Sequence, residues 1–470
     1  MTKRMNIALN EMDTMFYCFE CMGYPPVGKI HFELKGSAVD SDVLQRACSL
    51  MLERFPSFAG LLQENVTWFR WDISWYCDTA AAAEHAVAVF DYSGKNPEEA
   101  RKMLESHTHE PLQEYSSHEQ RPFRMVLCRM PGGVEHLLFY MNHACADGYG
   151  FLWFIQEFFG LYNYLLNTDT PYQWSASAPS TSPSSLLPKS LSRKVLTFAG
   201  ALGVLINRRL RNIGVKNANL IQGKSSFKGS VRTKHRILEA DAVAQYVKAA
   251  RYHDAGMSEM LVAAQVIALE RYRAECGEKC DGISVQIHHN IRTSPQQLRE
   301  TGNFFSTMII ETRAHERASP DRIIKNITHK RRCVKSERMA ERINSLLWLF
   351  RFGVTKKLLP FWGPAVFNNP EVGDSLTVSN VSRIWMDKQG NHLVTNLGKA
   401  EVQACYMYGT PIPSTGTFMI IYTVHERLYL SFHYFEWAMS DAQADRYLDM
   451  TVNALDEYCQ SNAANKNQRR

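Results

Sequence analysis

The sequence has no apolar run long enough to cross a bilayer without interruption, and little excess charge of either sign. Its first residues, MTKRMNIALNEMDTM, contain no apolar stretch or small-residue cleavage site of a secretory signal. The 53 Lys and Arg residues exceed the 47 Asp and Glu by a formal charge of only +6, and they do not alternate with stacking aromatics. We therefore expect a cytoplasmic, monomeric protein that binds no nucleic acid.

The sequence also has few cysteine spacings that are typical of disulfide frameworks or zinc sites. The 11 cysteines are an odd number scattered along the chain, which indicates reduced thiols in the core. Cys18 with Cys21, and Cys276 with Cys280, have spacings found in zinc sites, but neither pair has a matching histidine pair at a usual distance. We expect no metal site.

The length and composition are those of a globular protein with two domains. With 470 residues, 45% hydrophobic and 21% charged, the chain is too long for a single core of usual size. Residues 167–190 are rich in Pro, Ser and Thr, which break both helices and strands. We therefore assign residues 1–170 to a first half, 171–190 to a linker and 191–470 to a second half.

Hydrophobic periodicity predicts both helices and strands in the first half. A helix from about Asp40 to Arg54 can be capped by Asp40 or Ser41 and is terminated by Pro56. A Pro-Gly-Gly turn at 131–133 joins two strands into a hairpin, and the second strand leads directly into His143. Strands are predicted over residues 29–35, 123–129 and 134–141, and a further helix over 151–166.

The second half is also predicted to contain both helices and strands. Ser440 and Gln443 form a capping box that fixes the start of the last helix. His288 and His289 lie inside a strand pattern, and alternation alone explains them. Helices are predicted over 240–251 and 258–274, and strands over 283–289, 304–312, 417–424 and 428–434. Because each half offers a sheet with helices against it, we expect a pseudo-duplicated α/β sandwich.

Two segments, 195–206 and 346–367, are more apolar than a soluble surface requires. Each is too short or too interrupted to span a bilayer. The favoured interpretation is that they form core helices. The alternative is a helix lying on a membrane surface, which would make the protein a peripheral membrane protein. That alternative fits the basic residues beside the first segment, which are Arg193, Lys194, Arg208, Arg209 and Arg211.

The strongest chemical signal is the segment His143-Ala-Cys-Ala-Asp147-Gly148, between a predicted strand and a predicted helix. A lone histidine before a loop is more often structural. Here Asp147 can fold back to hold the loop in shape, and Gly148 supplies the permissive backbone of a tight turn. The imidazole of His143, neutral at pH 7, would then face a cavity and accept a proton.

With Asn142, this segment resembles the His-His-x-x-x-Asp-Gly signature of the CoA-dependent acyltransferase superfamily, which includes peptide-synthetase condensation domains and wax ester synthases. His143 aligns with the second, catalytic histidine of the signature. Asn142 replaces the first, as in branches that keep only the His-x-x-x-Asp core. The Asp-Phe-Gly-Trp-Gly motif of the plant branch has no match closer than Phe-Trp-Gly-Pro at 361–364.

Weaker likenesses follow in the family's order along nearly the whole chain. Residues 53–58 look like the helix end that precedes the second strand of the family. Asn290-Ile291-Arg292 looks like the element whose arginine pairs with the motif aspartate, which implies that Arg292 is the partner of Asp147. Taken alone, Arg292 would be interpreted as a surface arginine.

Two more elements are implied to lie along the channel. Gly302-Asn303-Phe304 looks like the Gly-Asn element that lines it, and Ser379-Asn380-Val381 looks like the Ser-Asn element of a loop near the active site. Turn chemistry alone would otherwise explain both. The implied channel or substrate residues are Asn142, Asn303, Ser379 and Asn380.

The resemblance implies an α/β fold, an α+β sandwich of two chloramphenicol-acetyltransferase-like domains with a central channel. It also implies acyl transfer from a thioester to a hydroxyl or amine of a small molecule, with His143 as general base and no covalent intermediate. The donor would be acyl-CoA or, alternatively, a thioester on an acyl carrier protein, and no cofactor would be bound permanently.

Three points stay open. The oxyanion donor is either a backbone N–H of the motif loop or a polar group of the Ser379-Asn380 element. The 24 Phe, 20 Tyr and 9 Trp could line a pocket for a lipophilic acceptor, although two cores also need aromatic residues. The rival hypothesis is a non-catalytic relative that binds a thioester or lipid, and such a protein would not need a base.

Overall fold

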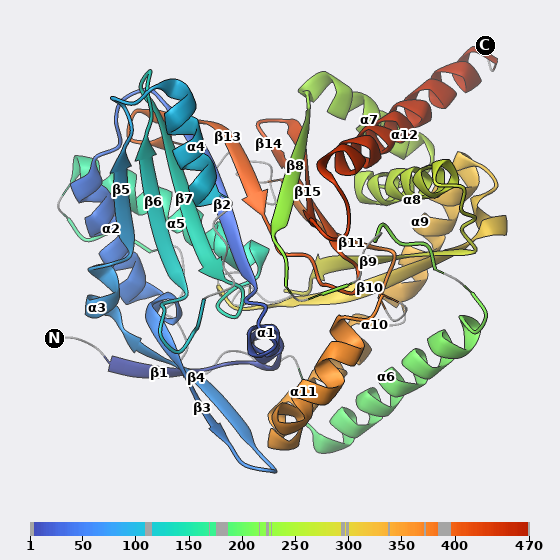
Figure 1. Ribbon diagram of the computed structural model, residues 1–470, viewed down its shortest axis with the longest axis horizontal. Coiled ribbons are helices and arrows are strands. Elements are labelled where there is room, and N and C mark those ends of the chain that lie inside the picture. Colours follow the sequence, from blue (N-terminus) through green and yellow to red (C-terminus); the bar gives the residue numbers. More distant parts are fainter. Residues whose placement is uncertain are drawn as a thin grey trace.

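The computed structural model consists of two sheet-and-helix halves, which confirms the predicted α/β sandwich (Figure 1). A smaller sheet in the order β1-β4-β3 extends below the first half. The structure describes residues 4–108, 115–168, 170–174, 187–215, 217–221, 225–226, 228–292, 297, 300–336, 339–370, 373–383 and 396–468. The strands of the smaller sheet are β1 (Arg4–Ala8), β3 (Gly60–Val66) and β4 (Trp71–Asp78).

The first half is built on a six-stranded sheet in the order β12-β13-β2-β7-β6-β5. Its strands are β12 (Asn396–Leu397), β13 (Ala400–Tyr408), β2 (Val27–Lys35), β7 (Val134–Asn142), β6 (Phe123–Arg129) and β5 (Val87–Asp91). Alternate residues of β6 face opposite sides, so Met125 and Leu127 enter the main core whereas Val126 and Cys128 pack with α4. The helices of this half are α1 (Glu11–Cys21), α2 (Ser41–Arg54), α3 (Thr79–Ala83), α4 (Pro97–Thr108) and α5 (Gly148–Asn167), with the short 3-10 helix η1 (Pro56–Ala59).

The second half is built on a six-stranded sheet in the order β10-β9-β11-β14-β15-β8. Its strands are β10 (Phe305–Arg313), β9 (Gly282–Asn290), β11 (Leu376–Arg383), β14 (Thr417–Val424), β15 (Arg427–Phe435) and β8 (Val231–Leu238). The apolar faces of α8 and α12 pack on this sheet and form its core. The helical elements are α6 (Leu191–Arg211), α7 (Ala240–Tyr252), α8 (Met257–Glu275), η3 (Ala314–Arg317), α9 (Pro320–Ser336), α10 (Met339–Ser345), η4 (Leu346–Arg351), α11 (Gly353–Phe367) and α12 (Asp441–Gln468).

Local capping signals fix several of the predicted boundaries. The side chain of Asp40 accepts hydrogen bonds from the backbone of Asp42 and Val43 at the start of α2. Ser440 and Gln443 form the predicted capping box, in which the backbone N–H of Ser440 donates to Gln443 Oε1 at 2.7 Å. These helices begin where the sequence predicts because the signal lies within one turn of the chain.

One strand from the later part of the chain pairs with the sheet of the first half, and so crosses the domain boundary that we assigned from the sequence. Strand β13 follows residue 190 by more than 200 positions, yet it pairs with β2 in the first sheet, from Glu401 opposite Lys35 to Tyr408 opposite Lys29. The assignment of everything after 190 to the second half did not anticipate this exchange. Of the predicted linker, residues 175–186 lie outside the described part of the chain.

The favoured interpretation of residues 195–206 as a core helix is wrong. They belong to α6, which packs through one side on α10 and η4 and leaves Leu196 73% and Ile206 59% exposed. Residues 346–367 divide into η4 and α11, where Leu359 is buried and Phe361 is 77% exposed. No helix in the described residues is both long enough and apolar enough to span a membrane.

Candidate active site

The predicted motif forms a short loop between β7, which ends at Asn142, and α5, which begins at Gly148. The loop is tied to its surroundings at its first residue, because the backbone N–H of His143 donates to the carbonyl of Pro26 at 2.7 Å. The imidazole of His143 is half-buried and stacks on the ring of Phe16, with centroids 3.9 Å apart and an interplanar angle of 20°. The backbone and the stacking ring together fix the plane of the imidazole.

Asn142 does not line a channel with its side chain. It is 1% exposed, and its amide nitrogen donates to Glu20 Oε2 and Ser117 Oγ, each at 3.1 Å. Its amide oxygen accepts from the backbone N–H of Ala144 at 2.8 Å. The implied role as a substrate residue therefore needs correction, since every one of these contacts holds the motif loop in shape.

Asn303 decides which nitrogen of His143 carries the proton. The amide nitrogen of Asn303 donates to two acceptors, the backbone carbonyl of His143 and Asp13 Oδ1, both at 2.7 Å. Its oxygen, Oδ1, must therefore be the atom that lies 3.1 Å from His143 Nδ1. Because a carbonyl oxygen can only accept, Nδ1 carries the hydrogen and Nε2 carries the lone pair.

Asp13, which the sequence did not single out, supports this arrangement from α1. Asp13 is 5% exposed, and its carboxylate accepts from Asn303 and from the backbone N–H of Asn10, so that α1 is joined to the second half. Burial raises the pKa of Asp13 to about 7. The only local signal at this position is the capping box of Asn10 and Asp13, which predicts a helix start and nothing more.

The ion pair expected between Asp147 and Arg292 is present and buried. The guanidinium of Arg292 donates to both carboxylate oxygens of Asp147, at 2.7 and 2.9 Å. The Arg292 side chain is 0% exposed and that of Asp147 is 6% exposed. A bidentate pair of this kind holds both partners in a fixed orientation.

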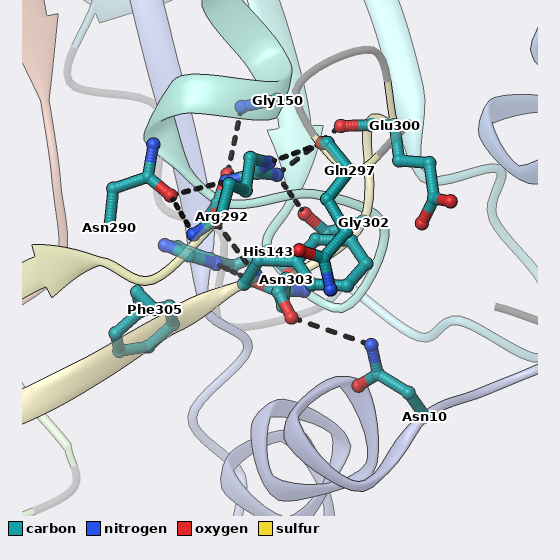
Figure 2. Close-up of polar contacts among 12 residues, drawn as sticks. Asn10, His143, Gly150, Asn290, Arg292, Gln297, Glu300, Gly302, Asn303 and Phe305 are labelled. Carbon is teal, nitrogen blue, oxygen red and sulfur yellow. Dashed lines mark hydrogen bonds and ion pairs between the residues drawn. The ribbon is translucent and has the colours of Figure 1, made fainter. Parts of the chain in front are cut away.

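Both members of the pair also organise the backbone around them. Asp147 caps α5 by accepting from the backbone N–H of Gly150 at 2.8 Å, and it accepts from Phe304 at 2.8 Å. The guanidinium of Arg292 also donates to the carbonyl of Gly302 at 2.6 Å (Figure 2). The pair therefore fixes the segment that carries Asn303, which in turn holds His143.

The two glycines of the motif region have different roles. Gly148 does not have a positive φ, and a Cβ at this position would meet no atom within 4 Å, so the expected need for a permissive backbone is wrong there. Gly150 is the constrained residue, because a Cβ would collide with the backbone carbonyl of Thr301 from the second half. The sequence alone offered no reason to prefer Gly150.

These two glycines allow a matched test of stability. We expect Gly150→Ala to destabilise the protein by about 1–3 kcal/mol, because the new methyl group must displace the backbone at Thr301. Gly148→Ala, at the first position of α5, should change stability by less than about 1 kcal/mol. Urea denaturation of both variants tests this prediction, and equal unfolding midpoints would contradict it.

Ser379 and Asn380 lie within strand β11 rather than in the expected loop. Ser379 is opposite His288 on β9, and the ring of His288 lies 5.3 Å from that of Phe305, a neighbour of His143. The described contacts do not join either residue to His143 directly. Their assignment to the substrate channel therefore stays a prediction.

A continuous row of rings leads from His143 across the face of the second sheet and on to the first. Successive centroids are between 4.9 and 6.4 Å apart. Burial lowers the pKa of His288 and of His136 to about 4, and it also lowers that of His433. The row, in order, consists of His143, Phe305, His288, Phe418, His433, Tyr408, His235, Tyr406, His31 and His136.

The described residues contain no cluster of three or more His, Cys, Asp or Glu that could hold a metal ion. Cys18 is buried in α1 and Cys21 is exposed at its end. Cys276 is exposed and Cys280 is partly exposed after α8. Neither cysteine pair is therefore accompanied by further ligands in this part of the chain.

No protein-family model and no curated protein matches this sequence. Solved structures do match over nearly the full length. A trichothecene 15-O-acetyltransferase from Fusarium sporotrichioides is similar with a TM-score of 0.68 over 97% of this chain and 95% of its own, at 12% identity. The first condensation domain of the CDA synthetase has a TM-score of 0.66 over 97% and 96% of the two chains, at 13% identity.

This chain has the fold of the CoA-dependent acyltransferases and condensation domains. The starter condensation domain of rhizomide synthetase, in complex with C8-CoA and Leu-SNAC, has the same fold, with a TM-score of 0.67 over 96% and 94% of the two chains and 12% identity. The two chloramphenicol-acetyltransferase-like halves implied by the sequence are therefore confirmed. At these identities the likeness concerns the fold, so the chemistry has to be argued from the site.

The Asn303 contact predicts a measurable change in pH dependence. Burial lowers the pKa of His143, whereas the hydrogen bond that Nδ1–H donates to Asn303 Oδ1 raises it. A histidine must be neutral to act as a general base, so if His143 has that role the rate should fall as the pH drops below its pKa. We expect Asn303→Ala to lower kcat roughly 10²-fold, because the ring loses its fixed tautomer, and to move this acid limb to lower pH.

Asn344→Ala is a suitable control for that experiment. Asn344 is also a buried amide, 3% exposed, and donates to the backbone of Phe305 without contacting His143. It should lower stability without moving the acid limb. A pH–rate profile of Asn303→Ala that overlies the wild-type profile would contradict the role assigned to Asn303.

Proposed function

We propose that the protein is an acyltransferase that moves an acyl group from a thioester to a hydroxyl or amine, with His143 as general base. The observation that carries this proposal is the contact between His143 Nδ1 and Asn303 Oδ1, which leaves the lone pair on Nε2. A histidine required only for packing or ligand binding would not need a fixed tautomer. The fold, shared with an O-acetyltransferase and with condensation domains, supports the same chemistry.

In this mechanism, Nε2 of His143 takes the proton of the acceptor O–H or N–H as the acceptor attacks the thioester carbonyl. The tetrahedral intermediate collapses, the carbon–sulfur bond breaks, and the imidazolium returns its proton to the departing thiolate. The Asn303 oxygen stabilises the imidazolium through Nδ1–H. Since burial lowers the pKa of His143, the ring starts neutral and gives the proton up readily.

The hydrogen bonds within the motif loop reduce the number of groups that could donate to the oxyanion. The backbone N–H groups of His143, Ala144 and Cys145 already donate to Pro26 and to Asn142. If the motif loop supplies the hydrogen bond to the oxyanion, the donating group is a backbone N–H that follows Cys145 in the chain. The alternative is a polar group of Ser379 or Asn380 on β11.

We propose a neutral, lipophilic acceptor with at least one polar group. The row of rings beside His143 supports this class, because its buried histidines have lowered pKa values and carry no charge at pH 7. Three buried atoms on or beside the row, His31 Nδ1, His433 Nε2 and Tyr429 Oη, have no hydrogen-bond partner among the described residues. A hydroxylated ring or chain could satisfy them while its apolar part packs on the aromatic rings.

Acyl-CoA is the proposed donor, and a carrier-protein thioester is the alternative. The neighbour structures support both, since one contains C8-CoA with Leu-SNAC and others are domains of peptide synthetases. The decisive experiment measures free thiol release by the purified chain with a panel of acyl-CoAs and acyl carrier proteins. Each donor is combined with neutral alcohols and with amines.

The His143→Ala variant provides the baseline for this panel. Release above that baseline, with acylated product found by mass spectrometry, would support the proposal, and the productive pairs would identify donor and acceptor. Saturable binding of a thioester without release above the baseline would instead favour the non-catalytic, thioester-binding alternative.

A further inference from the structure

Helix α6 has an apolar face that the rest of the described chain does not cover. The opposite face is the packed one: Ala201 is buried, Phe198 contacts Trp348, and Arg208 forms ion pairs with Glu311 and Asp374. Figure 1 shows α6 along the outer edge of the molecule, beside α11. The exposed apolar residues of α6 and of the turn after it are Leu191, Val195, Leu196, Leu202, Leu205, Ile206, Leu210 and Ile213, each between 41% and 73% exposed.

Two neighbouring elements continue this surface. Helix α11 and α6 both pack on η4, and α11 exposes Leu358, Phe361 and Val366. The turn between β3 and β4 carries Trp68, 59% exposed, and Phe69, 86% exposed. This turn is joined to α11, because the backbone N–H of Val354 donates to the carbonyl of Trp68 at 3.0 Å.

We call the surface formed by α6, α11 and the turn at residues 67–70 the α6–α11 face. An uncovered apolar surface of this extent is unusual for a soluble monomer and marks an interaction site. The aromatic residues at the turn are of the kind found where proteins enter the interface between water and lipid.

The charges of the α6–α11 face have one sign. Helix α6 contains five basic residues and no acidic residue, and α11 contains two lysines and no acidic residue. Arg193 and Arg209 are exposed, whereas Arg208 points inward to its ion pairs. Lys357 Nζ lies 4.4 Å from the ring centre of Trp68, which places a cation at the turn as well.

We propose that the α6–α11 face docks the protein onto an anionic lipid bilayer. An apolar helix face with cationic flanks matches such a surface, where the side chains enter the acyl boundary and the basic groups meet lipid phosphates. A second copy of the chain fits less well, because two cationic faces would repel each other. This site is separate from the His143 loop, so it can be tested without reference to acyl transfer.

The test is co-sedimentation of the full chain with phosphatidylcholine vesicles that contain or lack phosphatidylserine. The wild-type protein should bind the anionic vesicles in about 0.1 M salt and lose most of that binding in about 1 M salt, because the screening length falls from roughly 10 to 3 Å. The double variant Leu202→Glu/Ile206→Glu should bind about tenfold less or weaker still, since two apolar side chains leave the lipid. Arg193→Glu/Arg209→Glu should lose only the preference for phosphatidylserine.

Val89→Glu is the matched control, because Val89 is 41% exposed on β5, away from the α6–α11 face, and its replacement should not change binding. Circular dichroism of each variant verifies the fold. Wild-type protein that stays in solution with anionic vesicles at low salt would overturn the proposal. So would a dimer in light scattering that Leu202→Glu/Ile206→Glu converts to monomer, since the face would then belong to a second copy.

Discussion

His143→Ala is expected to lower the rate of acyl transfer roughly 10³-fold while leaving the fold intact. The substitution removes the group that acts as base in the proposed mechanism, and general-base catalysis alone contributes about 10²–10⁴-fold. The fold should persist, because His143 is half-buried and its side chain contacts only the rings of Phe16 and Phe305 and the amide of Asn303 among the described residues. Thiol release and circular dichroism measure the two parts of the prediction.

His253→Ala is the matched control for this variant. His253 is another half-buried histidine whose pKa is lowered by burial, and it is the C-cap residue of α7 in the second half. Its replacement should retain the wild-type rate. If His143→Ala keeps more than about a tenth of the wild-type rate, a loss too small for a missing base, His143 does not act in that role.

Arg292→Ala is expected to have the largest effect on stability, a loss of about 3–5 kcal/mol. Removal of the guanidinium leaves the carboxylate of Asp147 buried without its partner, and this uncompensated charge is the main cost. The carbonyl of Gly302 also loses its donor. The measurement is the free energy of unfolding from urea denaturation at neutral pH.

An exposed ion pair provides the control for Arg292→Ala. Arg271 pairs with Glu457 at 2.6 Å, but both side chains are about two-fifths exposed, so Arg271→Ala should cost no more than about 1 kcal/mol. Asp147→Asn combined with Arg292→Ala should recover part of the loss, because no buried charge then remains. A cost for Arg292→Ala no larger than that for Arg271→Ala would show that the buried pair does not hold the two halves together.

The sequence determined those features whose signals lie close together in the chain. The strand and the helix that flank the motif, the cap of α2 at Asp40 and the capping box at Ser440 depend on neighbours within a few residues, so periodicity and capping patterns predicted them. The motif itself placed His143 and Asp147 in one loop. The resemblance to a family, rather than any local pattern, pointed to Arg292 as the partner of Asp147.

Only the tertiary structure decided the contacts made between distant parts of the chain. Asp13 and Asn303 are 290 positions apart, and β13 pairs with a strand of the other half, so no local pattern could reveal either arrangement. Gly150 is constrained by a backbone that approaches from Thr301, and Ser379 lies in a strand because β9 and β14 flank it. The exposure of α6 was undetermined for the same reason, since an apolar helix pattern records which residues avoid water but not what covers them.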